Sequence, residues 1–214
     1  MDIVLDNLGG YTEAAWITVQ LTLLSFAAAF VIGVLIAAFR VSPVVPLRTF
    51  AVVWVETFRN SPVIVLMFLF VFGLTKVGVS YSFFVSAVIV LAVYTSTFVA
   101  ETVRSGINSV AKGQTEAGRA LGLTFGQLLG VVVMPQALRT VVAPLGSVFI
   151  ALIKNSSIAG AFAVLDITGF AGRLTTETEQ PIPAFLGAAV AYLILALPSG
   201  WAVGVIERRV AIKR

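Results

Sequence analysis

The sequence contains no cysteine and no histidine among its 214 residues. The first absence excludes a disulfide, the second excludes acid–base chemistry by imidazole, and together they exclude a Cys/His zinc site. Charged residues are also scarce, because Asp, Glu, Lys and Arg make up only 11% of the chain, whereas a soluble domain averages about 25%. A soluble globular domain is therefore a poor description of this protein.

Apolar residues dominate what is present. Hydrophobic residues make up 59% of the chain, with sixteen Phe and three Trp, and the mean hydropathy is +1.04. The net charge of +4 could indicate a nucleic-acid partner, but the basic residues are scattered near the ends of apolar runs. That pattern is typical of membrane orientation and not of phosphate binding. We therefore expect an integral membrane protein surrounded by lipid, with no nucleic-acid partner.

The first residues of the chain are acidic. Asp2, Asp6 and Glu13 precede the first long apolar run, and no basic residue does. A cleaved secretory signal would begin with a positively charged region. The first apolar run is therefore expected to stay in the protein as a membrane helix.

Five apolar segments are long enough to cross a bilayer as helices, which needs about 20 residues each. We predict an all-α membrane protein with the spans 14–39, 48–74, 81–106, 131–158 and 183–206. Pro62 follows Asn60 and Ser61 inside the second span, and proline predicts a kink there. Residues 160–182 are rich in charge and read as a loop that could carry a short interfacial helix.

The segments between the spans alternate in charge. One set comprises residues 39–48, 104–139 and 207–214, with the basic residues Arg40, Arg48, Arg104, Lys112, Arg119, Arg139, Arg208, Arg209, Lys213 and Arg214. The other set comprises residues 1–13, 73–81 and 160–182, with Lys76 and Arg173 against Asp2, Asp6, Glu13, Asp166, Glu177 and Glu179. The positive-inside rule predicts that the N-terminus lies outside and the C-terminus lies in the cytoplasm.

Residues 112–139 form the least apolar interval in the middle of the chain. Glu116-Ala117-Gly118 is followed after three residues by Gly122, and after nine more by Val132-Val133-Met134-Pro135. Gly122 suits a tight turn between two short helices, because glycine tolerates a positive φ. Such an element could insert into a groove of a partner. The alternative is a solvated linker or a lipid-packing face, since glycine recurs every four residues here.

This pattern resembles the EAA signature of the membrane subunits of ATP-binding-cassette importers, which reads E-A-A, three residues, G, nine residues, I-x-L-P. Gly118, Val132 and Met134 replace the second Ala, the Ile and the Leu. The resemblance extends from about residue 12 to 212. Three further stretches resemble the histidine, glutamine and glutamate branch of these permeases: Phe58-Arg59-Asn60-Ser61-Pro62, Glu101 to Ile107, and Lys154-Asn155-Ser156-Ser157. Three others look most like Gram-positive glutamate-uptake permeases: Arg40-Val41-Ser42-Pro43, Tyr94 to Glu101, and Arg104 to Asn108.

The resemblance implies a type I importer permease in a bacterial cell membrane. It implies that residues 112–130 are a coupling segment seated in an ATP-binding subunit, with the contributing residues Glu116, Ala117, Gly118, Arg119, Gly122, Leu123 and Pro135. The implied partners are two ATP-binding subunits, which bind ATP and Mg²⁺, a second permease subunit, identical or paralogous, and an extracytoplasmic amino-acid-binding protein. The sequence itself contains no G-x-x-x-x-G-K-[ST] phosphate loop. We expect no cofactor, metal site or catalytic residue in this chain.

The resemblance also places Lys154, Asn155, Ser156 and Ser157 at or next to the substrate cavity. An ammonium group there could hold a substrate carboxylate. The alternative is a structural lysine that pairs with Glu101 or extends to the membrane surface. The expected substrate is glutamate or aspartate, with glutamine or another polar amino acid as second choice.

The break in the second span supplies further candidates for the pathway. Asn60 and Ser61 are expected to line it, because a broken membrane helix exposes backbone groups to a polar solute. Arg59 could bind an anionic substrate, but the favoured interpretation is that Arg59 forms an i,i+3 ion pair with Glu56 on the same helix. A similar structural pair is expected between Glu101 and Arg104.

A small channel or secondary amino-acid carrier that needs no ATPase is the alternative function. Such a protein would show internal inverted repeats and acidic residues in the middle of its spans. No convincing repeat relates the two halves of the sequence, and the acids within the predicted spans are Glu56 and Glu101, both near the predicted cytoplasmic side. The importer is therefore the preferred prediction.

Overall fold

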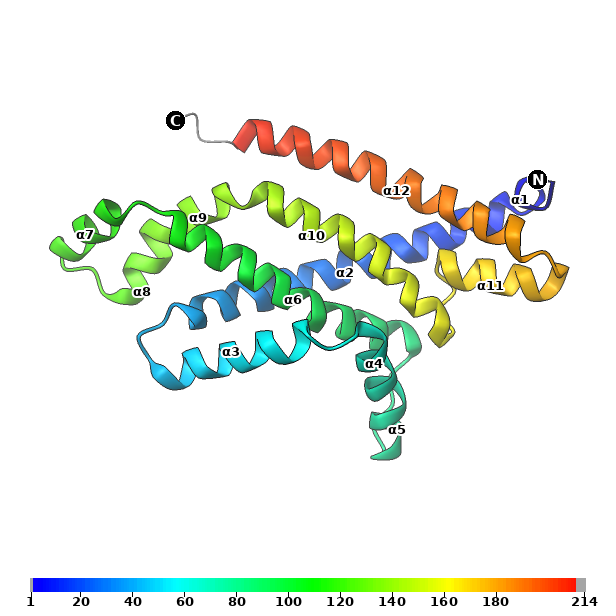
Figure 1. Cartoon of the computed structure of the whole chain (residues 1–214), viewed down its shortest axis with the longest axis horizontal. Helices are drawn as coiled ribbons and strands as arrows, with labels where there is room; N and C mark the ends of the chain where they lie inside the picture. The colour runs from blue at the N-terminus through cyan, green and yellow to red at the C-terminus, as the bar shows by residue number, and fades with distance from the viewer. Residues whose placement is uncertain (1, 211–214) are drawn as a thin grey trace.

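The computed structural model describes residues 2–210, and its regular structure in that range is entirely helical (Figure 1). Lys213 and Arg214, which contribute to the predicted orientation, lie outside the described residues. Four segments in the described range are long and apolar enough to cross a membrane. They are α2 (Leu8–Arg40), α6 (Phe83–Ser109), α10 with the 3-10 helix η3 (Val142–Phe162) and α12 (Pro181–Val210). The all-α membrane fold is confirmed.

The second predicted span bends at Pro62 by a larger angle than the proline kink that the sequence predicts. Helix α3 (Val45–Arg59) ends before Pro62, and a second apolar segment follows at an angle of 101°. This arm comprises α4 (Val63–Phe68), the π-helix η1 (Leu69–Gly73) and α5 (Leu74–Lys76). Figure 1 shows it leaving the bundle sideways. The two segments count as a fifth span only if they are taken together.

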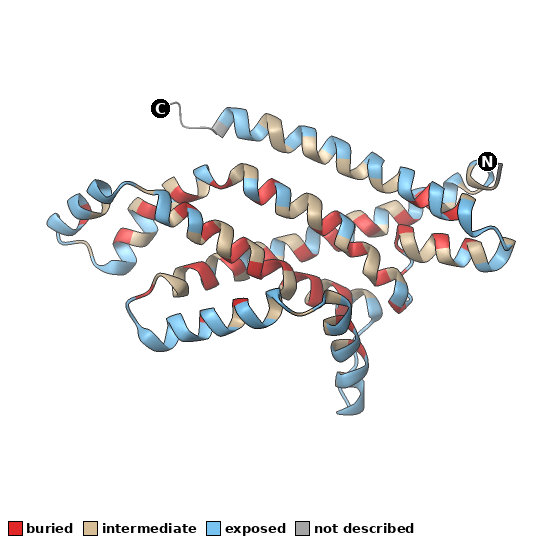
Figure 2. Ribbon diagram, in the orientation of Figure 1, coloured by how far each residue is buried: buried red, intermediate tan, exposed pale blue. Residues whose placement is uncertain are grey.

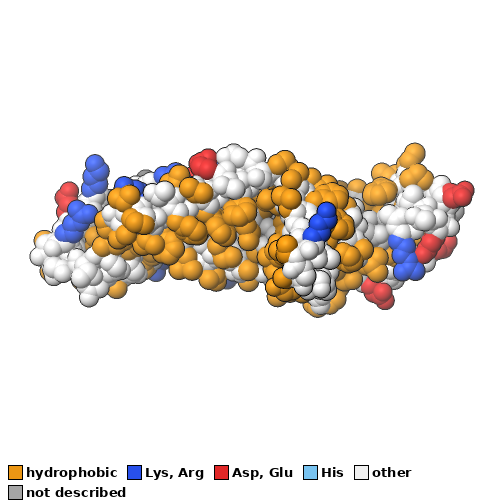
Figure 3. Space-filling model, turned by 90° about the horizontal axis from the view of Figure 1, so that it is seen from below, with side chains coloured by type: hydrophobic (Ala, Val, Ile, Leu, Met, Phe, Trp, Pro, Cys, Tyr) orange, Lys and Arg blue, Asp and Glu red, His pale blue; other side chains and the backbone are white. Residues whose placement is uncertain are grey.

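The core of the bundle is built on the contact between α2 and α6. These helices approach closely at Gly33, where a Cβ atom would lie 2.6 Å from Cβ of Val99 and 2.8 Å from the Ser96 carbonyl oxygen. Fully buried side chains such as Leu21 and Leu91 fill the interface. Figure 2 shows the buried residues concentrated in α2, α6 and α10, whereas α12 is largely exposed. Seen from below, apolar side chains cover the middle of the molecule and most charged ones lie toward its ends (Figure 3).

One end of the bundle carries a helical excursion between α6 and α10. It contains α7 (Lys112–Ala120), α8 (Phe125–Gln127), the π-helix η2 (Leu128–Val133) and α9 (Met134–Thr140). The π-helix ends two residues before Pro135, whose ring would clash with a carbonyl one turn earlier in a regular α-helix. The side-chain amide of Gln136 donates to the Val132 carbonyl at 2.8 Å. The chain then breaks at Val141, and the long apolar segment begins at α10 (Val142–Asn155).

The opposite end contains the short helix expected between residues 160 and 182. After η3 (Ser156–Phe162), helix α11 (Ile167–Thr178) begins at Asp166, whose Oδ1 accepts the Gly169 N–H at 2.8 Å. Tyr192 of α12 donates to Oδ2 of the same carboxylate at 3.0 Å. Asp166 is fully buried, and this burial raises the pKa of its carboxyl to about 6. The N-terminal helix α1 (Asp2–Asp6) lies at this end too (Figure 1).

Candidate functional site

Helix α7 ends in a Schellman motif, which makes a tight turn. The Gly122 N–H donates to the Arg119 carbonyl at 2.9 Å, and the Leu123 N–H donates to the Gly118 carbonyl at 3.2 Å. Gly122 has a φ of +78°, the left-handed conformation that glycine adopts without steric cost. Thr124 then starts α8 with a capping box, in which its hydroxyl accepts the Gln127 N–H and the Gln127 side chain accepts the Thr124 N–H. The local sequence therefore builds two short helices around a defined turn.

The tip of this turn presents apolar side chains that the chain itself does not cover. Leu121 is 82% exposed and Phe125 is 40% exposed. Glu116, Ala117 and Arg119 are exposed along α7. An apolar side chain at such a projecting tip is suited to contact with another protein.

Gly118 is the buried member of this segment. A Cβ atom on Gly118 would lie 2.5 Å from Cδ1 of Leu128 and 3.4 Å from Cδ1 of Leu123. The glycine therefore lets α7 pack against the start of η2. Gly126 and Gly130 have open space where a Cβ would lie, so they do not pack against another helix within the described residues. Pro135 is exposed at the start of α9 and does not lie at the tip.

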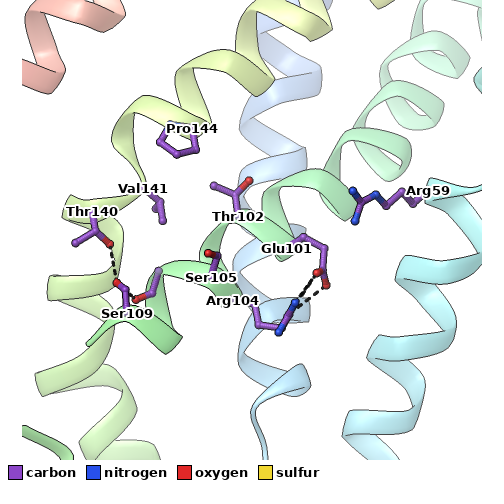
Figure 4. Close-up of a pocket in the computed structure, with 10 residues that line it drawn as sticks. Arg59, Glu101, Thr102, Arg104, Ser105, Ser109, Thr140, Val141 and Pro144 are labelled. Atoms are coloured by element: carbon purple, nitrogen blue, oxygen red, sulfur yellow. Dashed lines mark hydrogen bonds and ion pairs between the residues drawn. The ribbon is translucent and has the colours of Figure 1, made fainter. Parts of the chain in front are cut away.

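A cavity of about 540 Å³ lies between α3, α6 and the start of α10 (Figure 4). Its lining combines charged and hydroxyl side chains: Arg59, Glu101, Thr102, Arg104, Ser105, Ser109 and Thr140, with Gly106, Val141 and Pro144. The Ser109 and Thr140 hydroxyl oxygens lie 3.4 Å apart across it. A separate cavity of about 320 Å³ lies between α6 and α10, and Tyr94, Phe98, Ser147 and Asn155 are among its lining residues.

The carboxylate of Glu101 is the acidic group of the first cavity. It accepts a hydrogen bond from Nη2 of Arg104 at 2.8 Å and forms an ion pair with Nη2 of Arg40 at 3.1 Å. The i,i+3 pair with Arg104 was expected, whereas the partner on α2, Arg40, was not. Arg40 Nη1 is buried without a hydrogen-bond acceptor within the described range. In the sequence, Arg40 ends an apolar run and begins one of the stretches that resemble related permeases, and neither feature identifies its partner.

A model of the family described as "Binding-protein-dependent transport system inner membrane component" matches residues 29–212. The chain belongs to this family. It is thus a permease subunit with several membrane helices, which makes it a multi-pass cell membrane protein. The predicted resemblance is confirmed.

Relatives of this permease cover nearly its whole length. The chain is 36% identical over 209 residues to the probable glutamine ABC transporter permease protein GlnM of Bacillus subtilis, covering 98% of this chain and 97% of the relative. It is 37% identical over 214 residues to the glutamate transport system permease protein GluC of Corynebacterium glutamicum, covering 94% of each. A solved amino acid ABC transporter with histidines superposes with a TM-score of 0.88 at 29% identity, covering 96% of each chain.

The expected pair between Arg59 and Glu56 is wrong for this structure. Within residues 2–210, Arg59 forms no ion pair with Glu56, and its guanidinium instead lies 5.4 Å from the ring centre of Phe98. Glu56 accepts the Asn60 side-chain amide at 3.1 Å. The end of α3 and the break at Pro62 direct Arg59 toward the cavity (Figure 4). Sequence spacing alone favoured the local pair because i and i+3 are neighbours on any helix.

Asn60 is exposed and Ser61 is half-buried just after the end of α3, and neither lines either cavity. The Asn60 amide also donates to the Glu56 carbonyl at 2.8 Å, and the Ser61 hydroxyl donates to the Thr57 carbonyl at 2.7 Å. Both side chains therefore satisfy backbone carbonyls of their own helix.

The Lys154–Ser157 stretch is divided among different environments. Lys154 is exposed and, in the described range, is not paired with Glu101. Asn155 lines the second cavity. Ser156 is buried and donates to the Ile153 carbonyl at 2.7 Å, and Ser157 is half-buried. Arg59 and Asn155 thus line two different cavities, both beside α6 and α10, and Asn60 and Ser61 line neither.

Proposed function

We propose that this permease is one of two permease subunits of an ATP-driven importer of glutamate. Separate ATP-binding subunits bind ATP and Mg²⁺, and an extracytoplasmic binding protein delivers the amino acid. The observation that carries the proposal is the projecting turn after α7, with Leu121 82% exposed at its tip. It supports docking of the turn into a groove of an ATP-binding subunit, with Glu116 and Arg119 fixing the register through charge-assisted contacts.

The proposed orientation puts α7 and the C-terminus in the cytoplasm and the N-terminus outside. Arg40, Lys112, Arg119 and Arg209 lie at or near the end of the bundle that carries α7. The opposite end carries α11, with Glu177 exposed beside Arg173. This asymmetry supports the orientation through the positive-inside rule.

The proposed translocation pathway runs along α6 and α10 and joins the two cavities into one groove. Arg59 and Asn155 border this groove, and Lys154, Ser156 and Ser157 are proposed to act near its outer part. Asn60 and Ser61 are proposed to meet the solute when the helices move. The second permease subunit closes the open side of the groove.

An acidic substrate is favoured by the charge around the first cavity. Glu101 is shared by Arg40 and Arg104, and Arg59 adds another guanidinium without a carboxylate partner in the described part of the chain. An excess of positive charge attracts a second carboxylate more than an amide. The relatives named for glutamine and glutamate transport support the same two candidates, and we place glutamate first.

Uptake of labelled amino acids by the reconstituted complex tests this function. We expect ATP-dependent uptake of glutamate, weaker uptake of glutamine and none of arginine. Lys154→Ala should reduce glutamate uptake, and Lys76→Ala serves as an exposed control outside the groove. If arginine is the only amino acid taken up, the assignment of glutamate as substrate is overturned. Uptake by the isolated chain without ATP would favour an ATPase-independent carrier. Unchanged transport in Lys154→Ala would remove that lysine from the pathway.

A further inference from the structure

An apolar groove lies on the side of α10 that faces away from the polar cavities. It has a volume of about 380 Å³ and is formed by α2, α10 and α12. Its lining is almost wholly aliphatic or aromatic: Phe26, Phe30, Val142, Leu145, Gly146, Phe149, Ser199, Ala202, Val203 and Ile206. The one hydroxyl, of Ser199, already donates to the Leu195 carbonyl at 2.7 Å. The groove therefore offers no polar group that requires a partner.

The shape of the groove follows from the packing of three helices. Phe26 and Phe149 meet edge to face with ring centres 5.0 Å apart. Helices α10 and α12 touch at Gly146, where an added Cβ would overlap the side chain of Val203. Ala202 and Ile206 are exposed on the outer wall. The result is a narrow apolar channel that opens toward the surroundings of α12.

The groove has the depth of one membrane leaflet. Ile206 and Ser199 lie three and ten residues before Arg209, which corresponds to roughly 5 and 15 Å along a helix. Half of the hydrocarbon thickness of a bilayer is also about 15 Å. The lining therefore starts just inside the charged end of α12 and stops near the expected middle of the membrane.

The charged end of the groove is basic. Arg139 is exposed three residues before Val142, and Arg208 and Arg209 are exposed after Ile206, with Glu207 as the acidic residue beside them. Figure 1 shows α9 and the C-terminal end of α12 at the same end of the bundle. Basic sites between membrane helices on the cytoplasmic side are suited to anionic lipid headgroups.

We propose that this groove binds an anionic phospholipid, with one acyl chain between α2, α10 and α12 and the phosphate at Arg139, Arg208 and Arg209. The assignment to the cytoplasmic leaflet rests on the proposed orientation of the permease. A second permease copy fits the groove less well, because a copy that closes the pathway must face the polar side of α10. The acyl chain would fill the groove and stabilise the packing of α12 against α2 and α10.

Native mass spectrometry of the purified full-length complex, delipidated and then mixed with phosphatidylglycerol or phosphatidylcholine, tests the proposal. We expect retained phosphatidylglycerol, and a loss of affinity of about fivefold for each arginine neutralised in Arg139→Gln, Arg208→Gln and Arg209→Gln. Ala202→Phe should fill the groove and displace the lipid. Ala189→Phe, on an exposed part of α12 outside the groove, is the matched control.

Photo-crosslinking of the unsubstituted protein provides a measurement that does not depend on a variant folding. A phosphatidylglycerol with a photoreactive group near the end of one acyl chain should label peptides containing residues 142–149 or 199–206. Labelling elsewhere only, or equal retention of lipid by Ala202→Phe and Ala189→Phe, would overturn the proposal. So would equal retention of the two lipids, or dissociation of the permease pair in Ala202→Phe. Normal glutamate uptake without a retained lipid would overturn this inference alone and leave the proposed function in place.

Discussion

Replacement of Leu121 by alanine should weaken binding of the ATP-binding subunit without changing the stability of the permease. The side chain is 82% exposed at the tip of the turn after α7, the proposed coupling segment. Shortening it should therefore change the stability of the folded chain by no more than about 0.5 kcal/mol. Docking into a partner would bury it. Leu→Ala removes three carbon groups worth about 0.8 kcal/mol each when buried, and scaling by the exposed fraction leaves about 2 kcal/mol. That corresponds to roughly 30-fold weaker binding of the ATP-binding subunit.

The assay combines binding of the purified ATP-binding subunit with the stimulation of its ATPase by the permease in proteoliposomes. Thermal unfolding of the permease alone should be unchanged. Leu197→Ala is the matched control, because Leu197 is also a leucine, 68% exposed, but lies on α12 away from the coupling segment. If Leu121→Ala binds and stimulates the ATPase as well as the unsubstituted chain does, Leu121 does not dock and the argument from its exposure fails.

Three further predictions concern the turn, the ion-pair cluster and the buried carboxyl. Gly122→Ala should cost about 1 kcal/mol through its positive φ alone, since its Cβ would lie in open space; it should weaken ATPase stimulation, whereas Gly126→Ala should not. Glu101→Gln should lower stability by about 2 kcal/mol by leaving two guanidinium groups without a counter-charge, measured by thermal unfolding against Glu56→Gln as the exposed control. Asp166 has a folded-state pKa raised to about 6, so the stability it contributes is fully present below its unfolded pKa of about 3.9 and is lost as the pH rises through 6. Unfolding midpoints between pH 4.5 and 7.5 should therefore fall less in Asp166→Asn, and parallel curves would contradict the assignment.

Local features of the site were predictable from the sequence. The turn at Gly122 follows from glycine between two short polar stretches, and the break after α3 follows from Pro62, because both are set by backbone sterics within a few residues. The pair between Glu101 and Arg104 needs only a helix. These predictions depend on neighbours along the chain and not on how the helices pack.

Other features depended on contacts between distant segments. Arg59 contacts the ring of Phe98 and not the expected Glu56. Arg40 on α2 forms an ion pair with Glu101 on α6. The 101° bend after α3 was also larger than a proline kink suggests. A membrane helix is apolar on most of its surface, so its sequence does not reveal which side faces a neighbour or where its few polar side chains meet.

The sequence by itself determined the class of the protein and its family, and it predicts where a coupling segment lies. These follow from apolar length, from the missing charges, cysteines and histidines, and from the spacing of Glu116, Gly122 and Pro135. Only the tertiary structure decided that Arg59 and Asn155 each line a cavity beside α6 and α10. It also decided that Asp166 is buried between α11 and α12, and that α12 leaves an apolar groove beside α10. The reason is that the rotation and tilt of each helix are set by packing against the others.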